Sequence, residues 1–170
     1  DDGGSILWVQ TIEAIRRLSP KTTFETLIPD FKGNKKNLDR IILVHPEVVS
    51  HNMETVERLT KNVRVQASYK RSLFVLDYLK KSGIKRTKSG IMLGLGESDE
   101  EVLKSMKDLI DVGVDILTLG QYLQPTKKHL PVSKFIKPEK FSFFKEIGLE
   151  MGFKYVCLLY TSDAADDWSS

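Results

Sequence analysis

The sequence predicts an α/β fold in which parallel strands alternate with helices. Short β-branched runs alternate with segments of helical periodicity along the chain. The connections between successive strands are too long for hairpins, which favours parallel strands joined by helical crossovers. An open doubly wound sheet and a β/α barrel both satisfy this pattern. We favour a barrel because polar residues follow several strands, and barrel enzymes place their sites at that edge.

Each element is expected from its apolar spacing and from the proline, glycine and capping residues that bound it. The expected strands are residues 22–28, 47–51, 87–95, 115–119 and 153–156. The expected helices are residues 6–18, 38–44, 53–62, 69–81, 98–112 and 138–151. These strands are too few to close a barrel of about eight. The sequence therefore predicts a partial barrel whose N-terminal strands are missing.

The composition excludes some classes of function. The 170 residues are 41% hydrophobic and 29% charged, which is typical of one globular domain. The 26 Lys and Arg and the 23 Asp and Glu are interspersed, and this argues against nucleic-acid binding. Apolar runs are too short to span a membrane. The single cysteine, Cys157, cannot form a disulfide within the chain, which fits a reducing compartment.

Residues 87–101, TKSGIMLGLGESDEE, contain the most informative motif. Gly94 and Gly96 flank a strand end, where missing Cβ atoms would let a ligand approach the backbone. Ser98 starts a helix whose free N–H groups point toward the same end of the strand, at the mouth of the predicted barrel. Lys88 places a cation near the strand start and Glu97 an anion at its end. A tight β-to-α turn with a capping box explains the same spacing without a ligand.

Two further segments place polar side chains at strand ends. Residues 51–59, HNMETVERL, bring together Asn52 and Glu54, a pair suited to hydroxyl recognition such as a ribose; a helix cap by Asn52 is the alternative. Three histidines without ligand spacing argue against a metal cage. Residues 118–132, TLGQYLQPTKKHLPV, form a lip with a basic rim suited to an acidic protein partner. For Lys127 and Lys128 taken singly, an ordinary solvated loop is the favoured interpretation.

Read together, the segments resemble the lipoyl synthase family over residues 1–156. The motifs that carry the resemblance occur in order: TFETLIPDFKG, SHNMETV, RVQASYKRSL, TKSGIMLGLGES and DILTLGQYLQPTKKHLPV. Residues 90–97 also resemble the G-x-[I/M]-x-G-x-x-E strand of the radical SAM superfamily, which lies beside the adenine of its cofactor.

The resemblance implies a partial (β/α) barrel of the radical SAM type that binds S-adenosylmethionine and, in the full-length family member, two [4Fe–4S] clusters. It implies a radical that abstracts hydrogens from carbons 6 and 8 of a protein-bound octanoyl group, where sulfur from the auxiliary cluster is inserted. The implied partners are an octanoylated lipoyl domain of a 2-oxoacid dehydrogenase or a glycine-cleavage H protein, and ferredoxin or flavodoxin as electron donor. A monomer is expected, in the bacterial cytoplasm or in mitochondria, without nucleic acid or membrane.

The resemblance also implies roles for individual residues. Asn52 and Glu54 would contact the ribose and the methionyl part of the cofactor, and Lys88 its carboxylate. The remaining cofactor-binding candidates lie after the third strand: Gly94, Leu95, Gly96 and Glu97. The substrate-facing candidates lie after the fourth: Gln121, Tyr122 and Leu123.

The chain departs from the family at both ends. The cysteine triplets that bind the two clusters and the C-terminal Arg-Ser-Ser-Tyr motif are absent, so we expect a fragment that is inactive alone. Residues 157–167 resemble an in-frame translation of a sequencing adapter, and we expect residues 157–170 to be a disordered, non-native tail.

Two other functions remain open from the residues. A cluster-free β/α barrel lyase would need a Schiff-base lysine, for which Lys88 is the candidate. A non-catalytic module would bind a nucleotide-like ligand or a carrier domain.

Overall fold

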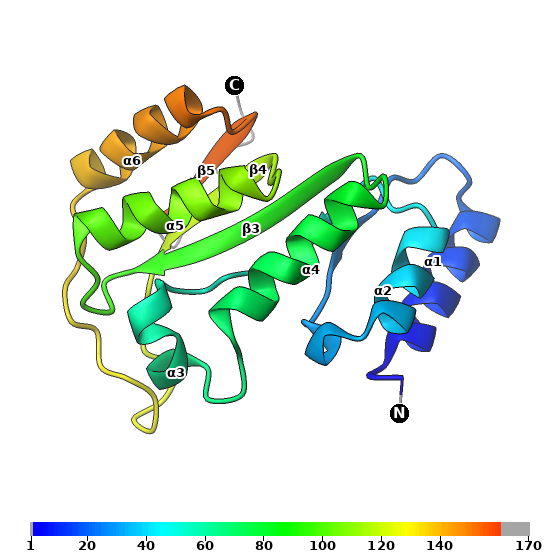
Figure 1. The fold of residues 1–170 in the computed structure, drawn as a ribbon, viewed down its shortest axis with the longest axis horizontal. Helices are drawn as coiled ribbons and strands as arrows, with labels where there is room; N and C mark the ends of the chain where they lie inside the picture. Colours follow the sequence, from blue (N-terminus) through cyan, green and yellow to red (C-terminus); the bar gives the residue numbers. More distant parts are fainter. Residues whose placement is uncertain (1, 161–170) are drawn as a thin grey trace.

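The computed structural model describes residues 2–160 and contains one parallel sheet in the order β1-β2-β3-β4-β5 (Figure 1). Its strands are β1 Glu25–Leu27, β2 Val48–Ser50, β3 Arg86–Leu93, β4 Ile116–Gln121 and β5 Tyr155–Leu159. Neighbours in the sheet are neighbours in the sequence, and every pairing is parallel. This is the wall of a β/α barrel, and the predicted fold class is confirmed.

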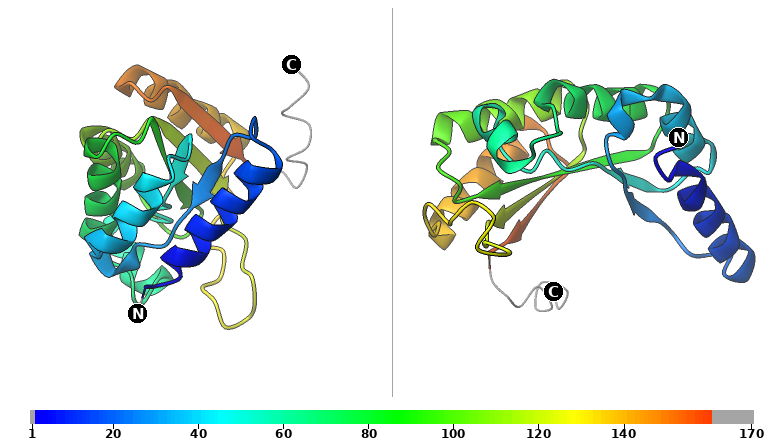
Figure 2. Two further views of the ribbon diagram at one scale, coloured as in Figure 1. Left: turned by 90° about the vertical axis from the view of Figure 1, so that its right-hand side faces the viewer. Right: turned by 90° about the horizontal axis from the view of Figure 1, so that it is seen from below.

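The helices of the crossovers line one face of this sheet. They are α2 Lys35–Leu43, α3 Thr60–Val63, α4 Tyr69–Lys81, α5 Asp99–Asp111 and α6 Pro138–Met151, with short 3-10 turns η1 Phe31–Gly33 and η2 Glu57–Leu59. The helix α1 Ser5–Leu18 precedes β1. Figure 2 shows α2, α4 and α5 along the outer, convex face, while the inner, concave face is open. None of the helices in the described part of the chain is long and apolar enough to cross a membrane.

Alternation along the strands separates the two faces. In β3 and β4, Ile91, Leu93, Leu117 and Leu119 are buried in a core shared with α5 and α6. Because successive side chains point to opposite faces, the residues between them lie on the concave face. In β3 these are Lys88, Gly90 and Met92. The core therefore fixes which side chains of the sheet can meet a ligand.

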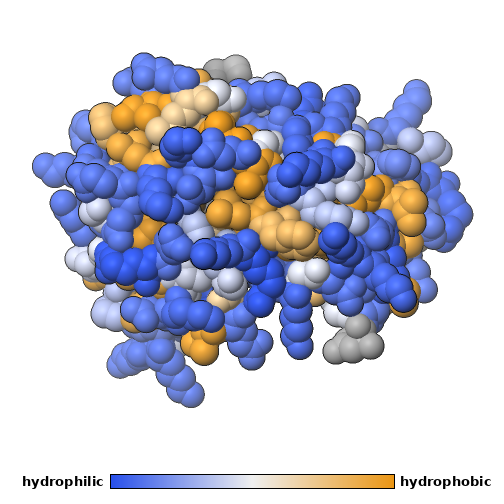
Figure 3. All heavy atoms as spheres, in the orientation of Figure 1, coloured by the Kyte–Doolittle hydropathy of each residue, from blue (hydrophilic) through white to orange (hydrophobic). Residues whose placement is uncertain are grey.

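The convex surface is mainly hydrophilic, as expected for helices that face water (Figure 3). Apolar side chains gather over α6 in the upper left of that view, where Phe143 and Leu149 are exposed.

The predicted helix over residues 53–62 is wrong in its first half. Glu54 forms a parallel bridge with Ile91, and helical structure begins only at η2. Met53 and Val56 are buried in the core although the backbone between them is not helical, because Glu54 has a φ of 69° and bridges to Ile91. Apolar spacing that suggests a helix is here produced by an irregular segment that returns to the sheet.

The fifth strand is longer than expected. β5 pairs with β4 as far as Gly120 opposite Leu159, so residues 157–159 form strand and not the beginning of a disordered tail. The remainder of the expected tail, residues 161–170, lies outside the described residues.

Candidate ligand site on the concave face

The carboxyl ends of all strands meet at one edge of the sheet because the strands are parallel. The segments that follow β2, β3 and β4 therefore share this edge, as the sequence predicted. The segments differ in whether their polar groups already have hydrogen-bond partners within the protein.

Asn52 follows β2 and lies on the concave face. A Cβ atom at Gly90 would be 3.0 Å from Asn52 Oδ1, so the glycine makes the room that the Asn52 side chain occupies. Arg64 Nη1 donates to the Asn52 carbonyl oxygen at 2.9 Å and fixes the backbone. The carboxamide itself has no hydrogen-bond partner among residues 2–160, and the cap of η2 is Val56. Capping therefore does not explain Asn52.

Glu54 is held in a left-handed conformation, with φ of 69°. Its N–H donates to Gly90 O and its carbonyl accepts from Met92 N–H, both at 2.8 Å. The carboxylate has no partner within the described residues. A non-glycine residue in this region costs about 1–2 kcal/mol and is concentrated at functional sites. Both Asn52 and Glu54 thus keep a polar group available beside β3.

His51, between β2 and Asn52, is a packing residue. It is 1% exposed, with Nδ1 3.0 Å from Ile28 O and Nε2 2.9 Å from Ser72 Oγ. Burial lowers the pKa of His51, so a neutral ring accepts from Ser72 and donates to the Ile28 carbonyl. Both ring nitrogens are therefore used within the protein.

The loop after β3 satisfies its own polar groups. The Glu97 carboxylate accepts from the N–H groups of Gly94 at 2.6 Å and Leu95 at 2.9 Å. Gly94 and Gly96 both have φ of 101°, and a Cβ at Gly94 would overlap Lys134 O and lie 2.6 Å from Gln121 Nε2. The tight-turn alternative explains this loop, and its glycines need no ligand.

Arg58, which no sequence motif singles out, connects the segments that follow β2 and β3. Arg58 binds Glu101 through Nε at 2.7 Å and donates from Nη2 to Gly96 O at 2.8 Å. Glu101 also forms a capping box with Ser98. The hydrogen bonds from Arg58 and from the Ser98 N–H lower the pKa of Glu101 to about 2. Because Arg58 and its partner are far apart in sequence, no local motif reveals the contact.

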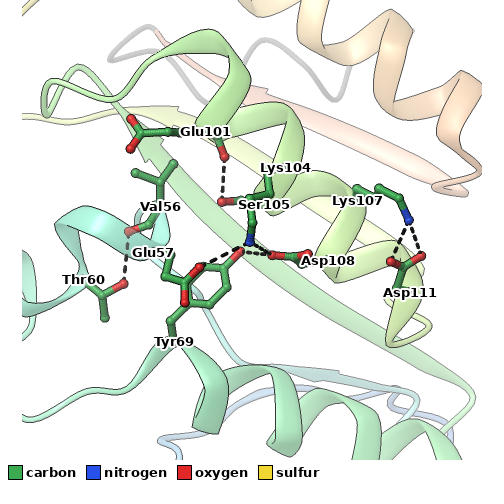
Figure 4. A network of polar contacts seen from close by, with 10 residues as sticks. All are labelled: Val56, Glu57, Thr60, Tyr69, Glu101, Lys104, Ser105, Lys107, Asp108 and Asp111. Atoms are coloured by element: carbon green, nitrogen blue, oxygen red, sulfur yellow. Dashed lines mark hydrogen bonds and ion pairs between the residues drawn. The ribbon is translucent and has the colours of Figure 1, made fainter.

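A polar network on the convex face anchors the same connection (Figure 4). Lys104 on α5 binds Asp108 at 2.8 Å and Glu57 at 3.3 Å, and Tyr69 Oη donates to Asp108 at 2.8 Å. Burial, with the Asp108 carboxylate alongside, raises the pKa of Tyr69. A hollow of about 320 Å³ beside this network is lined by paired charges on the convex side, away from the concave face.

Lys88 is on the concave face but is already paired. Its Nζ lies 2.7 Å from Glu25 Oε1, to which Ser50 Oγ donates at 2.9 Å. Burial opposes ionisation of Glu25, yet the hydrogen bonds from Lys88 and Ser50 prevail and lower its pKa. Lys88 also precedes Gly90 and so lies farther from the carboxyl edge. It does not fit the predicted role toward a cofactor carboxylate while Glu25 holds it.

The three candidates after β4 have different surroundings. Tyr122 is 5% exposed and its hydroxyl donates to Leu130 O at 2.8 Å, which places it in the core and not toward a substrate. Gln121 donates from Nε2 to Lys134 O at 3.3 Å and accepts at Oε1 from Ile136 N–H at 2.9 Å. Leu123 is 64% exposed. Of the three, Leu123 is the one left free to contact a partner.

The residues present do not fit an iron–sulfur cluster. Such clusters need several thiolates, and the chain has one cysteine. No group of three His, Cys, Asp or Glu side chains within residues 2–160 is placed to bind a metal ion. A nucleoside fits better, because Asn52 and Glu54 offer unpaired hydrogen-bonding groups next to Gly90.

The fold and this edge define the class of protein. The family model of the radical SAM superfamily matches residues 6–109, and the chain belongs to this superfamily. The relatives narrow the class. The chain is 66% identical over 155 residues to the lipoyl synthase of Christiangramia forsetii, covering 91% of this chain and 53% of the relative. It is equally identical, with the same coverage, to the mitochondrial lipoyl synthase of Nematostella vectensis.

These relatives confirm the resemblance predicted from the motifs. The chain spans about half the length of the curated relatives it matches. Among solved structures, methylornithine synthase superposes with a TM-score of 0.66 at 14% identity, covering 92% of this chain and 53% of that one. At that identity the likeness supports the fold alone.

Proposed function

We propose that this chain is the nucleoside-binding part of a lipoyl synthase. The observation that carries the proposal is the free Asn52 carboxamide over Gly90, at the carboxyl edge of a radical SAM barrel wall that is 66% identical to lipoyl synthases. The whole protein would insert two sulfur atoms into an octanoyl group on a lipoyl carrier domain. Ferredoxin or flavodoxin would supply electrons, and thiolates outside this chain would hold the two clusters.

In this proposal the residues of the chain bind and orient S-adenosylmethionine. When bound, the cofactor supplies the radical chemistry that activates the acyl chain. The Asn52 carboxamide would hydrogen-bond the ribose hydroxyls, and the Glu54 carboxylate would accept from the ribose or from the methionyl ammonium. The backbone of Gly94, Leu95 and Gly96 would form a wall beside the adenine, kept in shape by Glu97.

The lyase alternative is less well supported. Schiff-base chemistry needs a neutral amine, and an ammonium paired with the Glu25 carboxylate is not a nucleophile.

A chimera tests the proposal. In the chimera, residues 1–156 of this chain replace the matching segment of the C. forsetii lipoyl synthase, so that the relative supplies all of its other residues. We expect conversion of an octanoylated carrier domain to the lipoylated form, read by the mass of the carrier. Asn52→Ala in the chimera should raise the KM for S-adenosylmethionine about three- to tenfold, the effect of one neutral hydrogen bond.

Lys107→Ala is the matched control, because its exposed pair with Asp111 lies on the convex side of α5. A folded chimera that reconstitutes its clusters but forms no lipoyl product contradicts the proposed function.

A further inference from the structure

The loop between β4 and α6 has an unusual charge. Residues 121–137 contain four lysines and no Asp or Glu. All four are exposed, and none forms an ion pair within the described part of the chain: Lys127, Lys128, Lys134 and Lys137. Several helix lysines are paired, as Lys104 is with Asp108 and Lys107 with Asp111, and the helix lysines without an ion pair among the described residues, such as Lys36, Lys61, Lys70 and Lys145, lie on four different helices. The loop thus concentrates unpaired positive charge in one short segment.

This loop is held in a defined shape although it projects from the body (Figure 2). Tyr122 Oη donates to Leu130 O, and Gln124 Nε2 donates to His129 O at 2.8 Å. Its return is fixed at the mouth, where Ser133 N–H donates to Gly94 O at 2.8 Å. A surface that is ordered before binding loses less conformational entropy on association.

Two large apolar side chains lie among these cations. Leu123 is 64% exposed and Phe135 is 69% exposed. Single exposed apolar residues are ordinary, but an aromatic side chain within a charged rim is typical of a protein interface. The loop therefore offers both steering charge and apolar contact beside the mouth of the barrel wall.

We infer that Leu123, Phe135 and the four lysines form the docking surface for an acidic protein domain. This inference rests on the proposed function, since the partner it fits is the domain that presents the octanoyl-lysine. Docking beside Gly94 would place that lysine arm at the carboxyl edge, next to the concave face. The cations would steer the acidic surface and Phe135 would supply the desolvated contact.

A nucleic acid is the less suitable partner. The basic region is one short loop, and the first turn of α5 next to it is acidic, with Asp99, Glu100 and Glu101. Lys140, which follows the loop on α6, is already paired with Asp99. An extended phosphate backbone would have to cross these carboxylates, whereas a compact acidic domain would not.

The test is the affinity of this chain for an octanoylated lipoyl domain, measured by calorimetry at low and at moderate salt. The loop variant replaces the four lysines by alanine: Lys127→Ala, Lys128→Ala, Lys134→Ala and Lys137→Ala. The control variant removes the same charge from exposed, unpaired lysines elsewhere: Lys36→Ala, Lys61→Ala, Lys70→Ala and Lys145→Ala. We expect the loop variant to bind about tenfold more weakly or worse and to lose most salt dependence, with the control within about twofold.

Phe135→Ser separates the apolar contact from the charge. It should weaken binding about tenfold and leave the salt dependence unchanged. Equal weakening by the loop and control variants overturns the inference, as does a natural chain that fails to bind the domain. The inference is also overturned if the chain binds a DNA duplex, with a net charge similar to that of the lipoyl domain, more tightly than it binds the domain and if the loop variant loses that binding.

Titration with 5′-deoxyadenosine, run in parallel, distinguishes the two proposals. If the loop variant binds the nucleoside normally and binds the carrier domain as tightly as the unsubstituted chain does, the docking surface alone is overturned. If the unsubstituted chain does not bind the nucleoside, the result counts against the proposed function instead.

Discussion

The segments after β2 and after β3 meet at the same edge of the sheet but use their polar groups in opposite ways. After β3, the Glu97 carboxylate accepts from backbone N–H groups of its own loop, and Gly96 O accepts from Arg58. After β2, the Asn52 carboxamide and the Glu54 carboxylate have no partner within residues 2–160, and Glu54 adopts a strained conformation. The loop after β3 satisfies its own polar groups, whereas two side chains of the segment after β2 have none of their polar groups engaged within the described residues.

The side chains of a conspicuous motif can therefore serve the shape of the backbone and not contact with a ligand. The glycine and glutamate letters of the β3 motif are explained by backbone geometry. The contacts available to a nucleoside come from the neighbouring segment. Substitutions should therefore separate into those that alter stability and those that alter binding.

Gly94→Ala should have the largest effect on stability. It places a side chain at positive φ and against Lys134 O and Gln121 Nε2, so we expect a loss of about 2–4 kcal/mol in the free energy of unfolding. Urea denaturation measures it. Gly83→Ala is the control, because it shares the positive φ but meets nothing within 4 Å. Equal losses for the two variants would show that packing against the β4–α6 loop is unimportant.

Asn52→Ala should separate binding from folding. The carboxamide makes no hydrogen bond to another residue in the range 2–160, so the unfolding free energy should change by less than about 0.5 kcal/mol. Affinity for 5′-deoxyadenosine, measured by calorimetry, should fall about three- to tenfold. A large loss of stability would indicate that Asn52 is a packing residue.

Glu54→Gly should move stability and binding in opposite directions. Glycine adopts φ of 69° without steric strain, so the variant should gain up to about 1 kcal/mol in stability. Loss of the carboxylate should weaken nucleoside binding. Glu54→Gln, which keeps the strain and removes the charge, should weaken binding without a gain in stability. A Glu54→Gly variant that is less stable would contradict the assignment of strain.

The smallest effect is expected at Glu101, whose charge is exposed to solvent. Its folded pKa of about 2 lies below the ordinary 4.5, so its stabilisation is complete above pH 4.5 and is lost as the pH falls toward 2. Arg58→Ala should flatten this part of the stability profile, because Arg58 is the main cause of the shift. An unchanged profile in thermal unfolding between these pH values would contradict the role given to Arg58.

The sequence predicted the parallel α/β wall and the edge at which the candidate residues gather, because periodicity and strand-end residues depend on local order. It did not predict that Glu54 returns to pair with Ile91, since burial of Met53 and Val56 imitates helical spacing. The sequence also does not show which polar side chains have partners inside the protein. Lys88 and Tyr122 were predicted to face a ligand. However, pairing of the strands brings Glu25 to Lys88, and the path of the β4–α6 loop brings Leu130 O to Tyr122.

The central claim is that the segment after β2 supplies the contacts to a nucleoside. The most direct test is an NMR titration of this chain with 5′-deoxyadenosine. We expect the side-chain amide resonances of Asn52 and the N–H resonance of Gly90 to shift most, with Gly96 shifting less. Shifts confined to residues 94–98, or resonances of Asn52 and Gly90 that do not move at saturation, would contradict it.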